Sequence, residues 1–168
     1  NEWPWGLMEF IRLAKIKNLP LVCTLQNSYS LINRIVELGM TEIFFREKLS
    51  FFSYSPLGFG HLSGKYLKDP KAAGRVNLFP GYAQRYNKSG VEKAIEKYDA
   101  LAAKRNMRLT DLALSFVYSQ WFVTSTVIGA TNMNQLKQNI AAYGLDIVDE
   151  ELIQEIDAIH LDVMNPAP

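Results

Sequence analysis

The order of apolar and polar positions along the chain predicts alternating helices and strands. Apolar residues recur at helical spacing in six segments, which indicates helices with one buried face. These segments are residues 5–18, 34–48, 89–106, 109–120, 131–144 and 148–160. Shorter segments at 19–25, 49–55 and 124–130 are predicted as strands buried on both faces, and the apolar run LPLVCTL at 19–25 is the most typical of them.

Polar residues at the starts of four helices are predicted to cap them. A side-chain oxygen just before a helix can accept a hydrogen bond from a free backbone N–H of the first turn. We expect Ser89, Thr110 and Asp149 to act in this way, together with either Thr131 or Asn132. Residues 68–87, by contrast, are polar and punctuated by glycine, and they form too long a segment for a tight connection.

Helices that alternate with strands are the signature of a parallel α/β architecture. Only three strands are predicted, whereas a closed (β/α)8 barrel needs eight strands and about 250 residues. The chain has 168 residues and begins without methionine, close to a predicted helix. The pattern therefore predicts one unit, residues 1–168, that is a piece of a larger α/β protein.

Composition narrows the classes of partner. The chain is 48% hydrophobic and carries a net charge of +1, without an acidic tail or an evident basic stripe. Nucleic acid and membrane surfaces are therefore not expected partners. No apolar run reaches the roughly 18 residues of a spanning helix, and a cytoplasmic location is expected. The single cysteine, Cys23, is predicted to be buried, and the two histidines, His61 and His160, suggest no metal site.

Polar and small residues follow the predicted strands. Parallel sheets present functional groups at the carboxyl ends of their strands, so Gln26, Asn27, Tyr54 and the turn 129–131 are expected around one mouth. An amide at Gln26 could bind a carboxamide, and the ring of Tyr54 could stack on a planar ligand. The alternative for Gln26 and Asn27 is an amide that only stabilises the loop backbone, and this interpretation suits Asn27 better. The alternative for Tyr54 is an aromatic residue of the core.

Two glycine-containing segments could bind phosphate. The segment SPLGFGHLSGK, residues 55–65, could offer backbone N–H groups and Lys65, although its spacing is not that of a P-loop. Arg75 follows Gly74 and could fold over an anion. In VIGATNMNQLKQN, residues 127–139, a short turn opens a helix whose N-terminus suits a phosphate. Ordinary surface loops remain the alternative for both segments.

The motifs LQNSYSL, YSPLGFGHLSGKY and VIGATNMNQLKQNI, in this order, resemble the C-terminal part of an aldo-keto reductase. The resemblance covers essentially the whole chain and is strongest to the branch that contains Tas-type bacterial reductases and potassium channel β-subunits. It implies that the three strands are the sixth to eighth of a (β/α)8 TIM barrel. It also implies NADP(H) as cofactor and an aldehyde or ketone as substrate.

The resemblance assigns roles to matched residues. Asn1 and Gln26 would hold the nicotinamide carboxamide, and Tyr54 would stack on the nicotinamide ring. The remaining matches would bind phosphate, ribose or adenine. They are Ser55, Pro56, Leu57, Gly58 and Gly60 around the pyrophosphate, Lys65 and Arg75 closing over the phosphates, and Gly129, Thr131, Gln135, Gln138 and Asn139 at the 2′-phosphate and adenine. Gln138 departs from the usual glutamate, but its amide oxygen could still accept a hydrogen bond from adenine.

The proton-transfer residues of such reductases, an Asp, a Tyr, a Lys and a His, come from the first half of the barrel. No segment of this chain matches them, so Tyr29, Tyr54 and His61 are not assigned to those roles. The main hypothesis is the cofactor-binding part of an NADP(H)-dependent carbonyl reductase, inactive without a missing half or a partner chain. The alternatives are a non-catalytic NADP(H)-binding subunit and a truncated product without function.

Overall fold

The computed structural model of the chain describes residues 1–79, 81, 84–145 and 148–168. Within these ranges its sheet consists of three parallel strands in the order β1 (Thr24–Ser28), β2 (Ser50–Tyr54) and β3 (Val123–Val127). Helices separate the strands along the chain, which confirms the predicted α/β alternation. Three parallel strands of this kind fit part of a (β/α)8 barrel.

All six predicted helical segments contain helix, with shifted ends. They contain α1 (Pro4–Lys17), α2 (Met40–Glu47), α5 (Ser89–Lys104), α6 (Leu109–Ser119), α7 (Met133–Ala141) and α8 (Glu150–Asp162). Short helical turns add η1 (Ile35–Glu37), η2 (Gly58–Ser63), α3 (Lys65–Lys68), α4 (Arg75–Leu78), η3 (Gln84–Tyr86) and η4 (Ala142–Gly144). The predicted loop at 68–87 therefore holds short helices, although three of its residues, 80, 82 and 83, lie outside the described residues.

Two of the predicted helix caps are confirmed and two are wrong. Asn132 accepts a hydrogen bond from the backbone N–H of Gln135, and Asp149 accepts one from Leu152. Ser89, in contrast, is already the first residue of α5, and Thr110 lies inside α6. The residues before these two helices, Lys88 and Arg108, make no side-chain cap, so sequence preference misplaced both starts by one or two residues.

The first strand begins five residues later than predicted. Residues 19–23 have no regular secondary structure and lie before the amino end of β2, so strand pairing begins at Thr24, opposite Ser50. Gln26 and Asn27 consequently lie within β1 instead of following it. Cys23 is exposed, and its thiol donates to the carbonyl of Leu21 at 3.4 Å, so the expectation of a buried cysteine was wrong.

Only one face of the sheet is covered, which corrects the prediction of strands buried on both faces. Leu25, Phe51 and Ser53 lie on the covered face and are buried. Gln26 and Ser125 lie on the other face and are exposed, and Val127 at the end of β3 is 47% exposed. Successive side chains of a strand alternate between faces, so this pattern marks one helix-covered and one open face.

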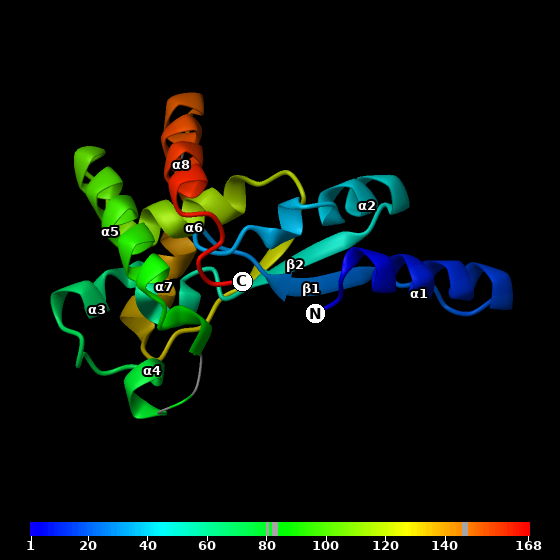
Figure 1. The fold of residues 1–168 in the computed structure, drawn as a ribbon, viewed down its shortest axis with the longest axis horizontal. Coiled ribbons are helices and arrows are strands. Elements are labelled where there is room, and N and C mark those ends of the chain that lie inside the picture. The colour runs from blue at the N-terminus through cyan, green and yellow to red at the C-terminus, as the bar shows by residue number, and fades with distance from the viewer. Residues whose placement is uncertain (80, 82–83, 146–147) are drawn as a thin grey trace.

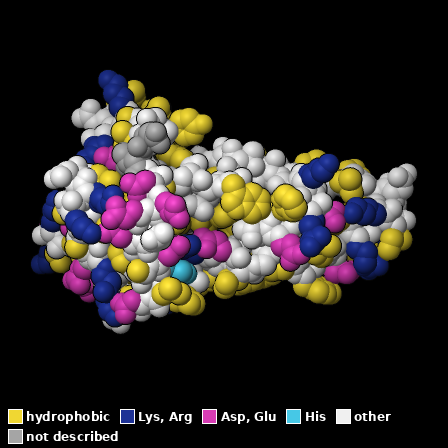
Figure 2. Space-filling view, turned by 90° about the horizontal axis from the view of Figure 1, so that it is seen from above, with side chains coloured by type: hydrophobic (Ala, Val, Ile, Leu, Met, Phe, Trp, Pro, Cys, Tyr) yellow, Lys and Arg dark blue, Asp and Glu magenta, His cyan; other side chains and the backbone are white. Residues whose placement is uncertain are grey.

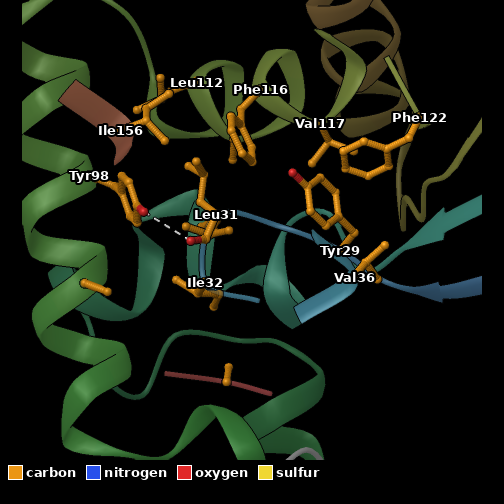
Figure 3. Close-up of a cluster of buried hydrophobic side chains, with 14 of the residues drawn as sticks. Tyr29, Leu31, Ile32, Val36, Tyr98, Leu112, Phe116, Val117, Phe122 and Ile156 are labelled. Atoms are coloured by element: carbon orange, nitrogen blue, oxygen red, sulfur yellow. Dashed lines mark hydrogen bonds between the residues drawn. The ribbon is translucent and has the colours of Figure 1, made fainter. Parts of the chain in front are cut away.

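The strands run from the end of the molecule that holds α1 and α2 toward the end that holds α3 to α8 (Figure 1). The main core lies between the segment that follows β1 and helices α5, α6 and α8 (Figure 3). Tyr29, Leu31 and Ile32 of that segment are at most 1% exposed. Tyr98 of α5 donates a hydrogen bond to the carbonyl of Leu31 at 3.1 Å, which ties the helix to the segment (Figure 3).

Candidate functional site

The carboxyl ends of the three strands are aligned. Ser28 of β1 pairs in register with Tyr54 of β2, and Tyr54 pairs with Val127 of β3. Neighbouring strands lie about 4.8 Å apart, so the segments that follow them start side by side. The structure therefore brings Tyr54 and the turn after β3 to one edge of the sheet, as the sequence predicted, whereas Gln26 lies opposite Phe52, two residues before the end of β1.

The N-terminal segment reaches the same edge. The amide nitrogen of Asn27 donates to the carbonyl of Glu2 at 2.9 Å, which places the exposed Asn1 beside the end of β1. Asn27 is thus a structural residue, in line with the sequence reading. Gln26 projects from the opposite face of β1, where its exposed amide can meet a ligand.

Tyr54 is half-buried at the end of β2, on the open face of the sheet that Gln26 also faces. Its ring is therefore not part of the main core, which was the alternative reading. Directly after it, Pro56 is buried and Leu57 packs against the core, so the chain that leaves β2 is held close to the sheet.

The loop after β2 has an unusual backbone. Within ten residues it holds five residues with positive φ: Ser55 (55°), Gly58 (52°), Phe59 (57°), Gly60 (94°) and Gly64 (73°). Glycine adopts this region at little cost, which explains the three glycines of the motif. Ser55 and Phe59 do so only under strain, and such strain often accumulates where a backbone is shaped for a ligand.

The glycine N–H groups of this loop are already used. Those of Gly58, Gly60 and Gly64 donate to the carbonyls of Ser55, Leu57 and His61 at 2.9, 2.9 and 3.0 Å. They therefore fix the shape of the loop, and direct donation to a phosphate would require these bonds to open. This differs from the expectation that the glycines offer free N–H groups.

Lys65 and Arg75 are both held by the loop. The ammonium of Lys65 donates to the carbonyl of Ala73 at 3.0 Å and lies 4.8 Å from the centre of the Tyr66 ring. The guanidinium of Arg75 lies 5.4 Å from the centre of the Phe59 ring, and the residue is exposed. Both cations are thus kept near the strained segment, where they could bind an anion.

The turn after β3 is organised differently. The side-chain oxygen of Gln135 accepts from both the N–H and the hydroxyl of Thr131, at 2.9 and 3.0 Å. The amide of Asn139 donates to the carbonyl of Gly129 at 3.2 Å, and Asn139 is only 4% exposed. These bonds bring Gly129, Thr131, Gln135 and Asn139 together at the start of α7, while Gln138 is exposed on the same helix.

The predicted residues lie along an open edge and not in an enclosed pocket. Two cavities of about 390 and 410 Å³ are lined by other residues. The first lies between η2, α3 and the start of α5, where His61, Tyr66 and Tyr86 contribute to its wall. His61 stacks on Tyr86 with ring centres 5.4 Å apart, and burial together with the charge of Lys65 lowers the pKa of His61 to about 4.

The sequence analysis missed the charge of the loop over this edge. Residues 64–88 hold six basic residues and one acidic residue, a net charge of +5, whereas the remaining 143 residues carry −4. The near-neutral net charge of the whole chain hid this difference, which a count of charged residues by segment would have revealed. Within this loop Arg85 and Tyr86 also reach the strand ends, and the sequence motifs had not singled out either residue.

The described part of the chain holds neither a membrane-spanning helix nor a cluster of metal-binding side chains. No helix there is long and apolar enough to cross a membrane. No group of three or more His, Cys, Asp or Glu side chains in the described ranges is arranged to bind a metal ion.

Comparison with known proteins identifies the family. The model of the "Aldo/keto reductase family" matches residues 2–160. The chain is 40% identical over its whole length to "Protein tas" of Escherichia coli K12 and covers 48% of that protein. It is 26% identical to a "Probable voltage-gated potassium channel subunit beta" of Oryza sativa, with 92% of the chain and 51% of the relative covered.

A third relative is the "L-glyceraldehyde 3-phosphate reductase" of Escherichia coli K12, which is 27% identical over 90% of the chain and 45% of the relative. The chain thus spans about half the length of these curated relatives. The predicted similarity to Tas-type proteins and channel β-subunits is confirmed. Since the family model matches nearly all of its residues, the chain belongs to the aldo/keto reductase family, whose fold is the (β/α)8 TIM barrel.

Proposed function

We propose that the chain is the C-terminal, cofactor-binding part of an NADP(H)-dependent reductase of aldehydes or ketones. The observation that carries this proposal is the alignment of Tyr54 and the two glycine-containing loops at one edge of the sheet, with Gln26 two residues before the end of β1. This arrangement suits a long dinucleotide that carries a pyrophosphate and a 2′-phosphate. Family membership supports a carbonyl substrate, and the three strands would be the last three of the barrel.

The residues present fit such a cofactor. A loop with a net charge of +5 suits the phosphates, and the open face beside Tyr54 leaves room for a flat ring. The bonded cluster at the start of α7 presents polar side chains and a helix N-terminus. Bound NADPH would supply the hydride for carbonyl reduction.

Each group of residues then has a distinct task. Asn1 and Gln26 would orient the carboxamide, and the Tyr54 ring would hold the nicotinamide face. Lys65 and Arg75 would neutralise the pyrophosphate beside the loop of Ser55, Pro56, Leu57, Gly58 and Gly60. The polar side chains near Gly129 would select the 2′-phosphate and adenine. These side chains are Thr131, Gln135, Gln138 and Asn139.

The surface of the chain supports a partner that completes the site. Helix α1 buries Leu7 and Ile11, yet Trp5, Phe10 and Ile16 on its other sides are 78, 57 and 67% exposed. Figure 2 shows hydrophobic side chains on the surface at the α1 and α2 end. Large apolar side chains that gather on an exposed surface often mark a contact with another element or chain. We therefore propose that further strands and helices, from the same protein or another chain, cover α1 and the open sheet face and supply proton transfer.

A non-catalytic NADP(H)-binding subunit is the second candidate, favoured by the similarity to a potassium channel β-subunit. It predicts the same cofactor site without turnover. A test of cofactor binding therefore applies to both candidates, and a reductase assay separates them.

The test is a titration with NADPH and NADH, followed by fluorescence and by the shift in melting temperature. It is performed on the protein with all the sequence that its gene encodes. We expect a clear preference for NADPH and a loss of about tenfold or more in affinity for Lys65→Met, since a charge-assisted contact is removed. Lys71→Met, an exposed lysine of the same loop, serves as the matched control. A folded protein that binds neither nucleotide, or that is indifferent to Lys65, would refute the proposal.

A further inference from the structure

Arg85 belongs to a short turn that docks on the strand ends. The turn η3 is anchored by Tyr86, which is 3% exposed and packs against His61 and Phe59. The side chain of Ser55, the first residue after β2, also lies beside the Tyr86 hydroxyl. The turn is therefore fixed to the edge of the sheet and not free to swing through solvent.

This anchoring places the guanidinium of Arg85 at the end of β1. Its Nη1 donates to the hydroxyl of Ser28 at 3.5 Å, and its Cζ lies 5.8 Å from the centre of the Tyr86 ring. Ser28 is two residues beyond Gln26 on the same face of β1, and it pairs in register with Tyr54. Arg85 thus contacts the position of β1 that pairs with Tyr54 and lies two residues beyond Gln26.

The arginines of the chain fall into two groups. Five of the seven pair with a carboxylate within the described ranges: Arg12, Arg34, Arg46, Arg105 and Arg108. The two without a carboxylate partner among the described residues are Arg75 and Arg85, and both lie in the loop over the strand ends. A half-buried guanidinium whose printed contacts within the described ranges are a hydroxyl and a ring retains most of its capacity to bind an anion.

We propose that Arg85 binds a carboxylate or phosphate group on the substrate, so that the enzyme prefers anionic aldehydes to neutral ones of the same length. This inference rests on the proposed function, because it assumes that the carbonyl is reduced beside Tyr54. The cofactor's own phosphates are assigned to Lys65, Arg75 and the start of α7. The carbonyl must approach the nicotinamide, so a cation at the end of β1 meets the substrate and not the far end of the cofactor. The planar guanidinium can form two parallel bonds to either anion.

The test compares matched substrates in the protein as its gene encodes it. The pairs are 4-oxobutanoate against butanal, and glyceraldehyde 3-phosphate against glyceraldehyde. We expect Arg85→Gln to lower kcat/KM by about tenfold to a hundredfold for at least one anionic aldehyde. The neutral partner should change by less than about twofold, and the KM for NADPH should stay near its wild-type value. The pair that responds identifies the anion as carboxylate or phosphate.

Two further variants separate a specific contact from a general effect of charge or folding. Arg85→Lys retains the charge and should recover part of the preference for the anionic substrate. Lys71→Gln removes a charge from the same loop at an exposed position and should leave the preference unchanged. Equal losses for both members of each pair, or a loss expressed mainly in the KM for NADPH, would overturn the inference.

A protein that reduces no aldehyde would contradict the proposed reductase but would still allow Arg85 to be tested. Calorimetry with succinate and with inorganic phosphate then compares wild type with Arg85→Gln. Weaker binding of either anion by the variant, with Lys71→Gln unaffected for that anion, supports an anion site at Arg85. Identical binding by wild type and Arg85→Gln rejects it.

Discussion

The loop after β2 and the turn after β3 leave the same edge of the sheet, yet they are built in different ways. The first contains five residues with positive φ and is packed against buried side chains of the core. The second is exposed at Gly129 and Thr131 and is held by hydrogen bonds among its own side chains. The first loop is therefore shaped by the core, whereas the second is shaped locally.

This difference separates stability from binding. A substitution in the packed loop disturbs the core and the site together, because they share side chains. A substitution in the exposed turn can change the site alone. Variants of equivalent residues in the two segments can therefore show which residues contribute to the stability of the fold and which contribute to ligand binding.

Gly58→Ala should have the largest effect on stability. A Cβ at this position would lie 2.9 Å from Cδ1 of Ile32 and 3.3 Å from Cε1 of Tyr86, at φ = +52°. Ile32 is fully buried, so it cannot move aside freely. Backbone strain and overpacking together should lower the free energy of unfolding by about 2–4 kcal/mol. Denaturant unfolding of the protein, followed by circular dichroism, measures this loss.

Gly129→Ala is the matched control for Gly58→Ala. Nothing lies within 4 Å of a Cβ at Gly129, so the free energy of unfolding should change by less than about 0.5 kcal/mol. Its affinity for NADPH should nevertheless fall if the turn approaches the 2′-phosphate. Equal destabilisation by the two substitutions would remove the distinction between the packed loop and the exposed turn.

The helices could be predicted more reliably than the strands. Helix α5 follows from its own apolar stripe, which includes Ala94, Ile95 and Tyr98. The start of β1 does not follow from its own residues, because the apolar run at 19–23 resembles a strand. Only the position of Ser50 on the neighbouring strand β2 decides where pairing begins. The prediction that the second sheet face is buried was wrong for a similar reason. The burial of that face depends on which elements cover it and not on the residues of the strands themselves.

The candidate site was predicted in outline and missed in detail. The glycines of the β2 loop and the small residues after β3 are local signals, so the sequence located both segments. The use of the Gly58 and Gly60 N–H groups depends on how the loop closes on itself, which residue types do not specify. Arg85 was missed because its position depends on the docking of Tyr86 against Ser55, a contact between residues 31 positions apart.

Asn139→Ala tests the exposed turn at its one buried polar residue. The substitution removes the hydrogen bond to the Gly129 carbonyl, and we expect a loss of about 1 kcal/mol in the free energy of unfolding. The preference for NADPH over NADH should also decrease, because the turn would no longer be held. Thermal melts with each nucleotide measure both effects, and Asn134→Ala, at an exposed position of the same helix, provides the reference. A variant that keeps full NADPH preference would mean that Asn139 only stabilises the helix.

The smallest effect should come from pH, and of the two segments only the packed loop should show it. Burial is the main cause of the lowered pKa of His61, about 4, and the charge of Lys65 adds to it. The unfolded chain, with an ordinary histidine pKa of about 6.5, therefore binds a proton more readily than the folded protein between these values. The stability from neutral His61 is complete above pH 6.5 and is lost as the pH falls toward 4.

His61→Gln should therefore show a smaller drop in melting temperature between pH 7 and pH 5 than the wild type. Other ionisable groups contribute alike to both proteins, so the difference between the two slopes isolates His61. His160→Gln is the comparison variant, since burial also lowers the pKa of His160 while Glu37 and Asp157 oppose the shift. It should alter the slope less. Identical slopes for His61→Gln and wild type would show that the packed loop opens before His61 is protonated, and the contrast with the exposed turn would then hold only near neutral pH.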